Sequence, residues 1–201
     1  MLSTKHFQRA ALPFAAASVI LAGLLSACGS ADRAKPAPTA APAPAVSTSA
    51  TAPAGAPQNQ APAKTQDWLK IYSGTAPTGT NAVQLAIADN SAVGQYVTAT
   101  DRALYRFDND TAKPPKSNCA GNCAATWPPL VVQRGQAVYA GGIDPQLIGF
   151  VERADGACQI TIAGWPVYFF AKDLKAGDLL GQGVGGVWHA VTPTGGKAGV
   201  N

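Results

Sequence analysis

Four side chains in this sequence have the right types to hold a metal ion or to exchange electrons. Cys119, Cys123, Cys158 and His189 would supply the ligands of a Cys3His zinc site. The pair Cys119 and Cys123 could also cycle between a dithiol and a disulfide. Its C-x3-C spacing, however, is not the C-x2-C arrangement at a helix N-terminus that lowers the pKa of a thiol. The sequence therefore favours a structural role for this pair over a redox one.

Residues for acid–base or covalent catalysis are scarce. Glu152 is the only glutamate, Met1 is the only methionine, and the second histidine, His6, lies in the first nine residues. General acid–base and nucleophilic mechanisms need positioned groups of a kind that this chain hardly contains. We therefore expect no catalytic residue, no resident metal and no cofactor. The protein is predicted not to be an enzyme.

The most regular signal is a pattern that occurs twice. Residues 105–110 and 168–173 both read Tyr-x-Phe-x-x-Asp, and a lone Trp follows the Asp after 17 residues in the first copy and 15 in the second. Two such copies in one order indicate an internal repeat. The members of the pattern are Tyr105, Phe107, Asp110 and Trp127 in the first copy, and Tyr168, Phe170, Asp173 and Trp188 in the second.

A strand must carry the Tyr and the Phe of each copy. Side chains at positions i and i+2 of a strand share one face, and the Asp then falls at the strand's end, where its carboxylate accepts backbone N–H groups. This predicts rings in the core and Asp residues that cap loops. The alternative is that some of the many rings, Trp165 included, line a ligand groove.

Apolar alternation predicts a mainly β fold. Strands at 83–88, 96–100 and 103–107 form a meander, strands at 150–153, 158–162 and 165–170 repeat it, and a last strand covers 187–191. A single helical turn is expected near 124–127. The predicted fold is two pseudo-repeats of antiparallel β-meander, about 83–130 and 147–192, packed as one domain over 67–193. A flexible tail follows at 194–201.

The glycine-rich stretch 181–186 matches G-x-G-x-x-G by its letters alone. It precedes the predicted strand at 187–191 and opens no helix, and phosphate binding by this motif needs the helix N-terminus. We expect these glycines to form a tight loop with positive φ angles.

The N-terminus is typical of an exported protein. A basic segment and an apolar stretch at 10–25 are followed by Leu25-Ser26-Ala27-Cys28, which resembles the bacterial lipobox. This resemblance implies a signal peptide at 1–27, cleavage before Cys28, and attachment to a lipid bilayer through acylated Cys28. We expect residues 28–66 to form a disordered Ala/Pro-rich tether. Gly29 favours the periplasmic face of the outer membrane if the cell is Gram-negative.

Export bears on the cysteines and on the charge. In an oxidising compartment we expect a Cys119–Cys123 disulfide, with Cys158 either a free, buried thiol or a replacement for one partner.

The predicted domain contains five Lys and four Arg against nine Asp and one Glu, a net charge of −1, although the whole chain carries +4. No basic stripe indicates nucleic-acid binding.

Several motifs together resemble one family. Several segments resemble the bacterial secreted-repeat lipoproteins with the motif Tyr-x-(Phe/Trp/Tyr)-x-x-Asp: residues 104–111, Cys119 and Cys123 with the stretch to Leu130, and residues 153–156, 164–170 and 181–189. Because the biochemical function of that family is largely unknown, the resemblance implies a location and a fold tendency, not a reaction. Cys158 departs from the pattern, where a polar residue is expected.

These observations predict a cell-envelope lipoprotein whose domain is a non-enzymatic binding or interaction module. Its partner would be an envelope protein or a small aromatic or apolar ligand. Two alternatives remain open at this point. One is a redox or electron-transfer accessory protein that uses a quinone-like ligand or thiols, and the other is a structural envelope protein.

Overall fold

The computed structural model describes residues 60–199. The expected signal peptide, Cys28 and most of the expected tether lie outside these described residues. Within them, no helix is long and apolar enough to cross a membrane. The elements in chain order are β1 (Lys64–Gln66), β2 (Leu69–Ser73), β3 (Val83–Asn90), β4 (Gly94–Ala99), β5 (Arg102–Ala103), β6 (Tyr105–Phe107), β7 (Thr111–Ala112), β8 (Pro115–Lys116), α1 (Asn122–Thr126), β9 (Ala137–Ala140), η1 (Pro145–Leu147), β10 (Ile148–Glu152), β11 (Cys158–Ile162), β12 (Trp165–Tyr168), η2 (Val184–Gly186) and β13 (Trp188–Ala190).

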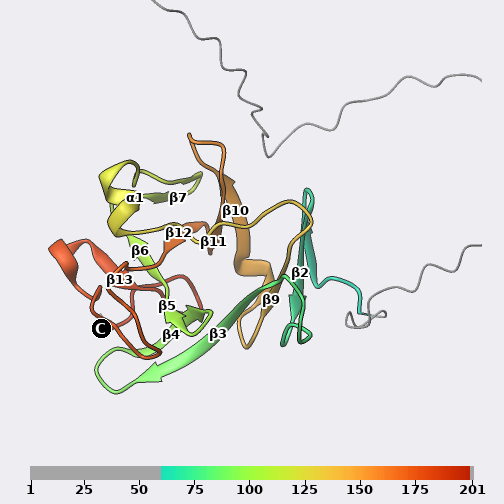
Figure 1. The fold of residues 1–201 in the computed structure, drawn as a ribbon, viewed down its shortest axis with the longest axis horizontal. Coiled ribbons are helices and arrows are strands. Elements are labelled where there is room, and N and C mark those ends of the chain that lie inside the picture. The colour runs from blue at the N-terminus through green and yellow to red at the C-terminus, as the bar shows by residue number, and fades with distance from the viewer. Residues whose placement is uncertain (1–59, 200–201) are drawn as a thin grey trace, which may run out of the picture.

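The predicted mainly β fold is confirmed. One sheet has six strands in the order β1-β2-β9-β3-β4-β5, a second has five in the order β10-β11-β12-β6-β13, and β7 and β8 form a small hairpin. Figure 1 shows β2 and β9 at one end of the domain, and β6, β12 and β13 with α1 at the other. The helical turn expected near 124–127 is α1.

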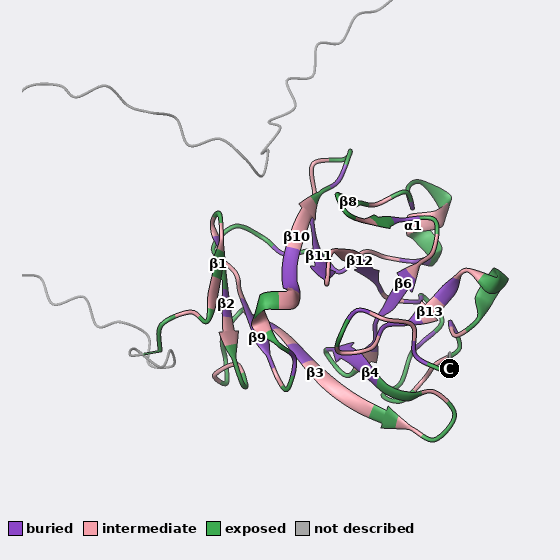
Figure 2. Ribbon diagram, turned by 180° about the vertical axis from the view of Figure 1, so that it is seen from behind, coloured by how far each residue is buried: buried purple, intermediate pink, exposed green. Residues whose placement is uncertain are grey.

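Buried apolar residues alternate with exposed polar residues, as predicted, in a strand that has one face against the core. In β2, Leu69 and Ile71 are buried whereas Lys70 and Ser73 are exposed. All five residues of β11 are buried, which agrees with its place inside the second sheet, between β10 and β12. Figure 2 shows how buried residues concentrate on the strands of this sheet. The aliphatic core contains Leu69, Ile71, Leu85, Val97, Leu104, Ile148, Ile160, Ile162, Val167 and Val191.

The two repeats are not two separate meanders. The strand predicted at 103–107 divides at Leu104: β5 pairs with β4 in the first sheet, and β6 crosses to the second sheet. There β6 lies between β12 and β13, both of which belong to the second repeat. The strand that carries the first motif is therefore hydrogen-bonded to the strand that carries the second.

Two parallel pairings were not predicted. The short strand β9 pairs in parallel with β2 and with β3. The strands β2 and β9 are too short to show a clear alternation of apolar and polar residues. In addition, β2 is followed by glycine and proline residues around 74–82, and β9 lies within the connecting segment at 131–142.

The folded region extends beyond 67–193 at both ends. Lys64–Gln66, assigned to the tether from the sequence, form β1, and the Lys64 ammonium donates to the Gln146 carbonyl oxygen at 3.0 Å. The expectation of a flexible tail from residue 194 is wrong for 194–199. Ala198 is 1 % exposed, and its N–H donates to the Ala190 carbonyl oxygen at 2.8 Å.

Candidate functional site

The two motif tyrosines are direct partners in the second sheet. Tyr168 of β12 faces Tyr105 of β6 in antiparallel register, and Val167 faces Arg106. Antiparallel pairing of equivalent residues relates the two copies by a local two-fold axis that passes through the tyrosine pair. Both rings are 0 % exposed. The centre of the repeat is thus the centre of the domain.

Each tyrosine hydroxyl binds the aspartate of the other copy. The Tyr105 hydroxyl donates to Asp173 Oδ2 and the Tyr168 hydroxyl donates to Asp110 Oδ2, both at 2.6 Å. A short bond from a hydroxyl to a carboxylate in a dry interior is among the stronger hydrogen bonds of proteins. This exchange ties the two copies together, and no feature of the sequence pattern reveals which Tyr takes which Asp.

The second oxygen of each aspartate holds a loop. Asp110 Oδ1 accepts the backbone N–H of Asn118 at 2.7 Å, and Asp173 Oδ1 accepts that of Leu180 at 3.0 Å. These are the backbone contacts that the sequence suggests for an Asp at a strand's end. Because each carboxylate also receives a tyrosine hydroxyl, one side chain fixes a loop in its own copy and a ring in the other.

Burial shifts the ionisation of both pairs. The pKa values of Tyr105 and Tyr168 are raised, first because burial disfavours the phenolate and then because each hydroxyl donates to a carboxylate. The pKa values of Asp110 and Asp173 are also raised, mainly by burial, although the tyrosine hydrogen bonds act in the opposite direction. The hydroxyl protons therefore stay on the tyrosines well above neutral pH.

The remaining motif rings form one column through the axis. Trp127 and Trp188 stack with their ring centroids 3.8 Å apart and their planes at 2°. Phe107 stacks on the outer face of Trp188 at 4.2 Å, and Phe170 stacks on Trp127 at 4.3 Å. The order Phe107–Trp188–Trp127–Phe170 alternates between the two copies. Each ring of one copy is thus packed against a ring of the other.

This packing decides between the two interpretations of the aromatic residues. Trp127 is 4 % exposed and Trp188 is 5 % exposed, so these rings and the two tyrosines belong to the core. The alternative that they line a ligand groove is wrong. Trp165 is partly exposed, and the guanidinium of Arg106 lies 3.4 Å from its ring centroid.

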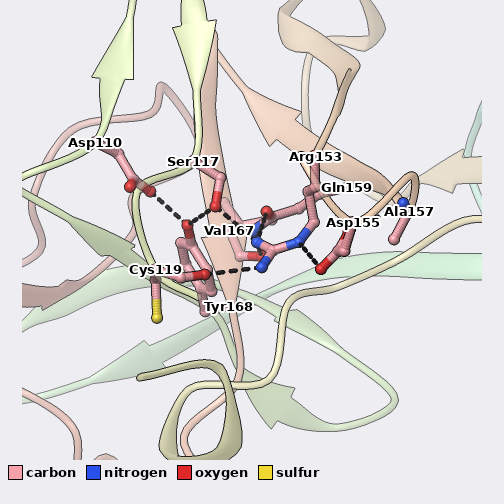
Figure 3. A network of polar contacts seen from close by, with 9 residues as sticks. All are labelled: Asp110, Ser117, Cys119, Arg153, Asp155, Ala157, Gln159, Val167 and Tyr168. Atoms are coloured by element: carbon pink, nitrogen blue, oxygen red, sulfur yellow. Dashed lines mark hydrogen bonds and ion pairs between the residues drawn. The ribbon is translucent and has the colours of Figure 1, made fainter. Parts of the chain in front are cut away.

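A buried arginine extends the Asp110–Tyr168 pair (Figure 3). Since the Tyr168 hydroxyl donates its hydrogen bond to Asp110, its oxygen accepts one from Ser117 Oγ at 2.7 Å. Ser117 Oγ in turn accepts from Arg153 Nη1 at 2.6 Å. Arg153 also donates to Gln159 Oε1 at 2.7 Å and to the Cys119 carbonyl oxygen at 2.8 Å. The sequence alone did not indicate that Arg153 is buried, because its neighbours form an ordinary polar turn.

The Tyr105–Asp173 pair has a different hydrogen-bond donor to its tyrosine oxygen. The Tyr105 oxygen accepts the backbone N–H of Gly181 at 3.3 Å, whereas the Tyr168 oxygen accepts from Ser117. A Cβ atom at Gly181 would lie within 2.9 Å of Tyr105 and Trp127 ring atoms, so only glycine fits there. The glycines Gly183, Gly185 and Gly186 have φ angles of 73°, 59° and 70°. The stretch is a tight loop, as its place before a strand predicts.

The predicted Cys119–Cys123 disulfide is present. It links Cys119, which precedes α1, to Cys123 in its first turn, and the backbone N–H of Trp127 donates to the Cys123 carbonyl oxygen at 2.8 Å. Cys158 is 6 % exposed, but the described residues contain no free cysteine, so the free-thiol alternative is wrong. Within residues 60–199, no three His, Cys, Asp or Glu side chains gather as metal ligands, and Cys119, Cys123, Cys158 and His189 do not form the zinc site considered above.

Replacing one motif tyrosine tests the reciprocal bonds. Tyr105→Phe or Tyr168→Phe leaves a buried carboxylate oxygen without its donor, and we expect each to lower the free energy of unfolding by about 1–3 kcal/mol. Tyr72→Phe, whose hydroxyl forms no hydrogen bond within residues 60–199, is the matched control, with a change within about 0.5 kcal/mol. Urea denaturation measures all three variants. Equal effects of the three would contradict the assignment.

Alkaline titration tests the raised tyrosine pKa values. In the unfolded chain tyrosine ionises at about pH 10. Because the folded-state pKa values of Tyr105 and Tyr168 lie higher, the stability that they contribute is complete below about pH 10 and is lost as the pH rises further. Tyrosinate absorbance should therefore show a late step that coincides with the loss of near-ultraviolet circular dichroism. Gradual ionisation of every tyrosine before unfolding would contradict this.

Two segments of the chain, residues 89–131 and 149–192, match the family described as a secreted repeat of unknown function. Each segment contains one Tyr–Asp–Trp set, and together they cover the two strands that meet at the local axis. No curated protein and no solved structure matches the chain. The chain therefore carries two copies of the secreted repeat of unknown function.

Proposed function

We propose that this chain is a cell-envelope lipoprotein whose β domain acts as a non-enzymatic binding module. Acylated Cys28 would anchor it, and the Ala/Pro-rich tether would hold the domain away from the bilayer. The secreted-repeat match supports a location outside the cytoplasm. The lipobox-like Leu25-Ser26-Ala27-Cys28 supports the anchor.

One observation carries the binding role: the motif side chains that could do chemistry bind one another in the core. A catalytic acid or nucleophile must reach its substrate, whereas Tyr105 and Tyr168 are 0 % exposed and Asp173 is 1 % exposed. Their hydroxyl and carboxylate groups are occupied across the local axis. The repeat motif therefore builds a scaffold, and function is left to the surface that this scaffold holds.

The scaffold suits recognition because it is pre-organised. Loops that follow both motifs are fixed by Asp110 and Asp173, and Arg153 holds the Cys119 loop. A surface that is ordered before binding loses less conformational entropy when its partner arrives. The redox alternative has less support, since Cys119 of the disulfide is 1 % exposed and is covered by the aromatic core.

The anchor is tested by one substitution. Cys28→Ala in the full chain removes the residue that would be acylated, so the protein should leave the membrane fraction and appear in the soluble envelope fraction. Immunoblotting of separated fractions measures this, with Cys119→Ala as a control that keeps Cys28. Persistence of the Cys28→Ala protein in the membrane fraction would contradict lipid anchoring.

The binding role is tested by retention on envelope components. The Cys28→Ala protein is mixed in turn with lipid vesicles, with cell-wall glycan sacculi and with envelope proteins on beads. We expect retention on at least one of the three. Tyr105→Phe, measured where it remains folded, should be retained equally, because the motif is scaffold. Retention on none of them, or loss of retention with the fold intact, would overturn the proposal.

A further inference from the structure

A polar hollow of the domain lies away from the motif core. It has a volume of about 470 Å³ and is lined by residues of the turn at 133–137, the segment at 80–82, β2 and β9. Figure 1 shows β2 and β9 at the end of the domain away from α1. Ten residues line the hollow, and none of them belongs to the repeat pattern. The aromatic, amide and cationic side chains among them are Tyr72, Tyr139, Asn81, Gln133, Gln136 and Arg134.

A stacked tyrosine pair forms one wall of this groove. Tyr72 of β2 and Tyr139 of β9 are register partners, and their ring centroids are 5.0 Å apart with planes at 17°. Tyr139 is only 7 % exposed, whereas Tyr72 is partly exposed. Tyr72 is therefore the outer ring, and the buried ring behind it holds its plane in place. A rigid flat ring at the surface provides a platform at low entropy cost.

Side-chain amides form the rim, and those of Asn81 and Gln136 are held in place by hydrogen bonds. Gln136 donates to Asn81 Oδ1 at 2.9 Å, which links two segments that are 55 residues apart. The same Gln136 accepts the Gln133 backbone N–H at 2.9 Å. The Asn81 amide N–H groups and the Gln133 side chain are exposed and have no hydrogen-bond partner within residues 60–199. They are free to bind a ligand.

Arg134 is the only charged residue among the ten that line the groove. Its guanidinium lies 5.6 Å from the ring centroid of Trp68, a cation–π contact that helps to fix the position of this side chain. No lining residue carries a carboxylate, so the one formal charge among the lining residues is positive, although the predicted domain has a net charge of −1. An anionic group on the ligand would meet this cation and no carboxylate among the lining residues.

We propose that this groove binds a saccharide that bears a carboxylate. The C–H face of a pyranose ring packs on Tyr72, its hydroxyls pair with the Asn81 and Gln133 amides, and its carboxylate pairs with Arg134. This inference rests on the binding role proposed above and assigns it a ligand class. A flat apolar ligand fits less well, because it would bury the amides without partners. Nucleic acid fits less well because it needs several cations.

Titration calorimetry with two probes tests the assignment. The acidic probe is a tetrasaccharide of alternating N-acetylglucosamine and N-acetylmuramic acid, and the neutral probe is the tetramer of N-acetylglucosamine. The Cys28→Ala protein should bind the acidic probe more tightly. Arg134→Gln should weaken acidic binding about tenfold and remove the preference, since one charge-assisted contact is worth at least about 1.4 kcal/mol. Tyr72→Ala and Gln133→Ala should weaken both probes.

Lys175→Gln, a charge removed from an exposed loop outside the groove, is the matched control and should leave both affinities unchanged. A Lys175→Gln effect equal to that of Arg134→Gln would mean non-specific attraction and would overturn the site. Absence of saccharide binding, with retention on vesicles or envelope proteins, would overturn this inference and leave the binding role standing. Retention on no envelope component would overturn both. Near-ultraviolet circular dichroism checks that each variant is folded.

Discussion

The reciprocal hydrogen bonds between tyrosine and aspartate are the constraint on which the rest of the domain depends. Each bond takes its hydroxyl from one repeat and its carboxylate from the other, at 2.6 Å in both cases. A buried carboxylate without a donor is costly, so neither repeat can satisfy its own aspartate when it is alone. This explains why the pattern occurs as a pair. The motif specifies an interface between two copies of itself.

The other features of the core follow from that interface. Once Tyr105 and Tyr168 face each other, the two tryptophans meet on the same axis and stack at 3.8 Å. Glycine is required at position 181, because a larger residue would collide with the rings. In the other pair, Ser117 Oγ donates to the Tyr168 oxygen, and Arg153 donates to Ser117 Oγ. The two copies thus share one geometry but satisfy their hydroxyls with different neighbours.

The sequence predicted the parts of the fold that are local. Alternation located β3, β4, β10, β11 and β12, and the spacing of Cys119 and Cys123 agreed with their disulfide. It did not predict that β6 leaves its own meander, because pairing between distant strands depends on contacts that no local pattern encodes. The same limit hid the Tyr–Asp exchange. The sequence predicted the motif rings in the core, with a ligand groove as the alternative, and the structure buries those rings. It places a polar groove at Tyr72 and Tyr139, which the sequence did not indicate.

The central claim is that the motif acts across the repeats, and double-mutant cycles test it directly. The cycle of Tyr105→Phe with Asp173→Ala pairs groups from different copies, and the cycle of Tyr105→Phe with Asp110→Ala pairs groups from the same copy. We predict a coupling energy of about 0.5–3 kcal/mol for the first cycle and less than about 0.5 kcal/mol for the second. Stronger coupling within one copy than across the two would contradict the account.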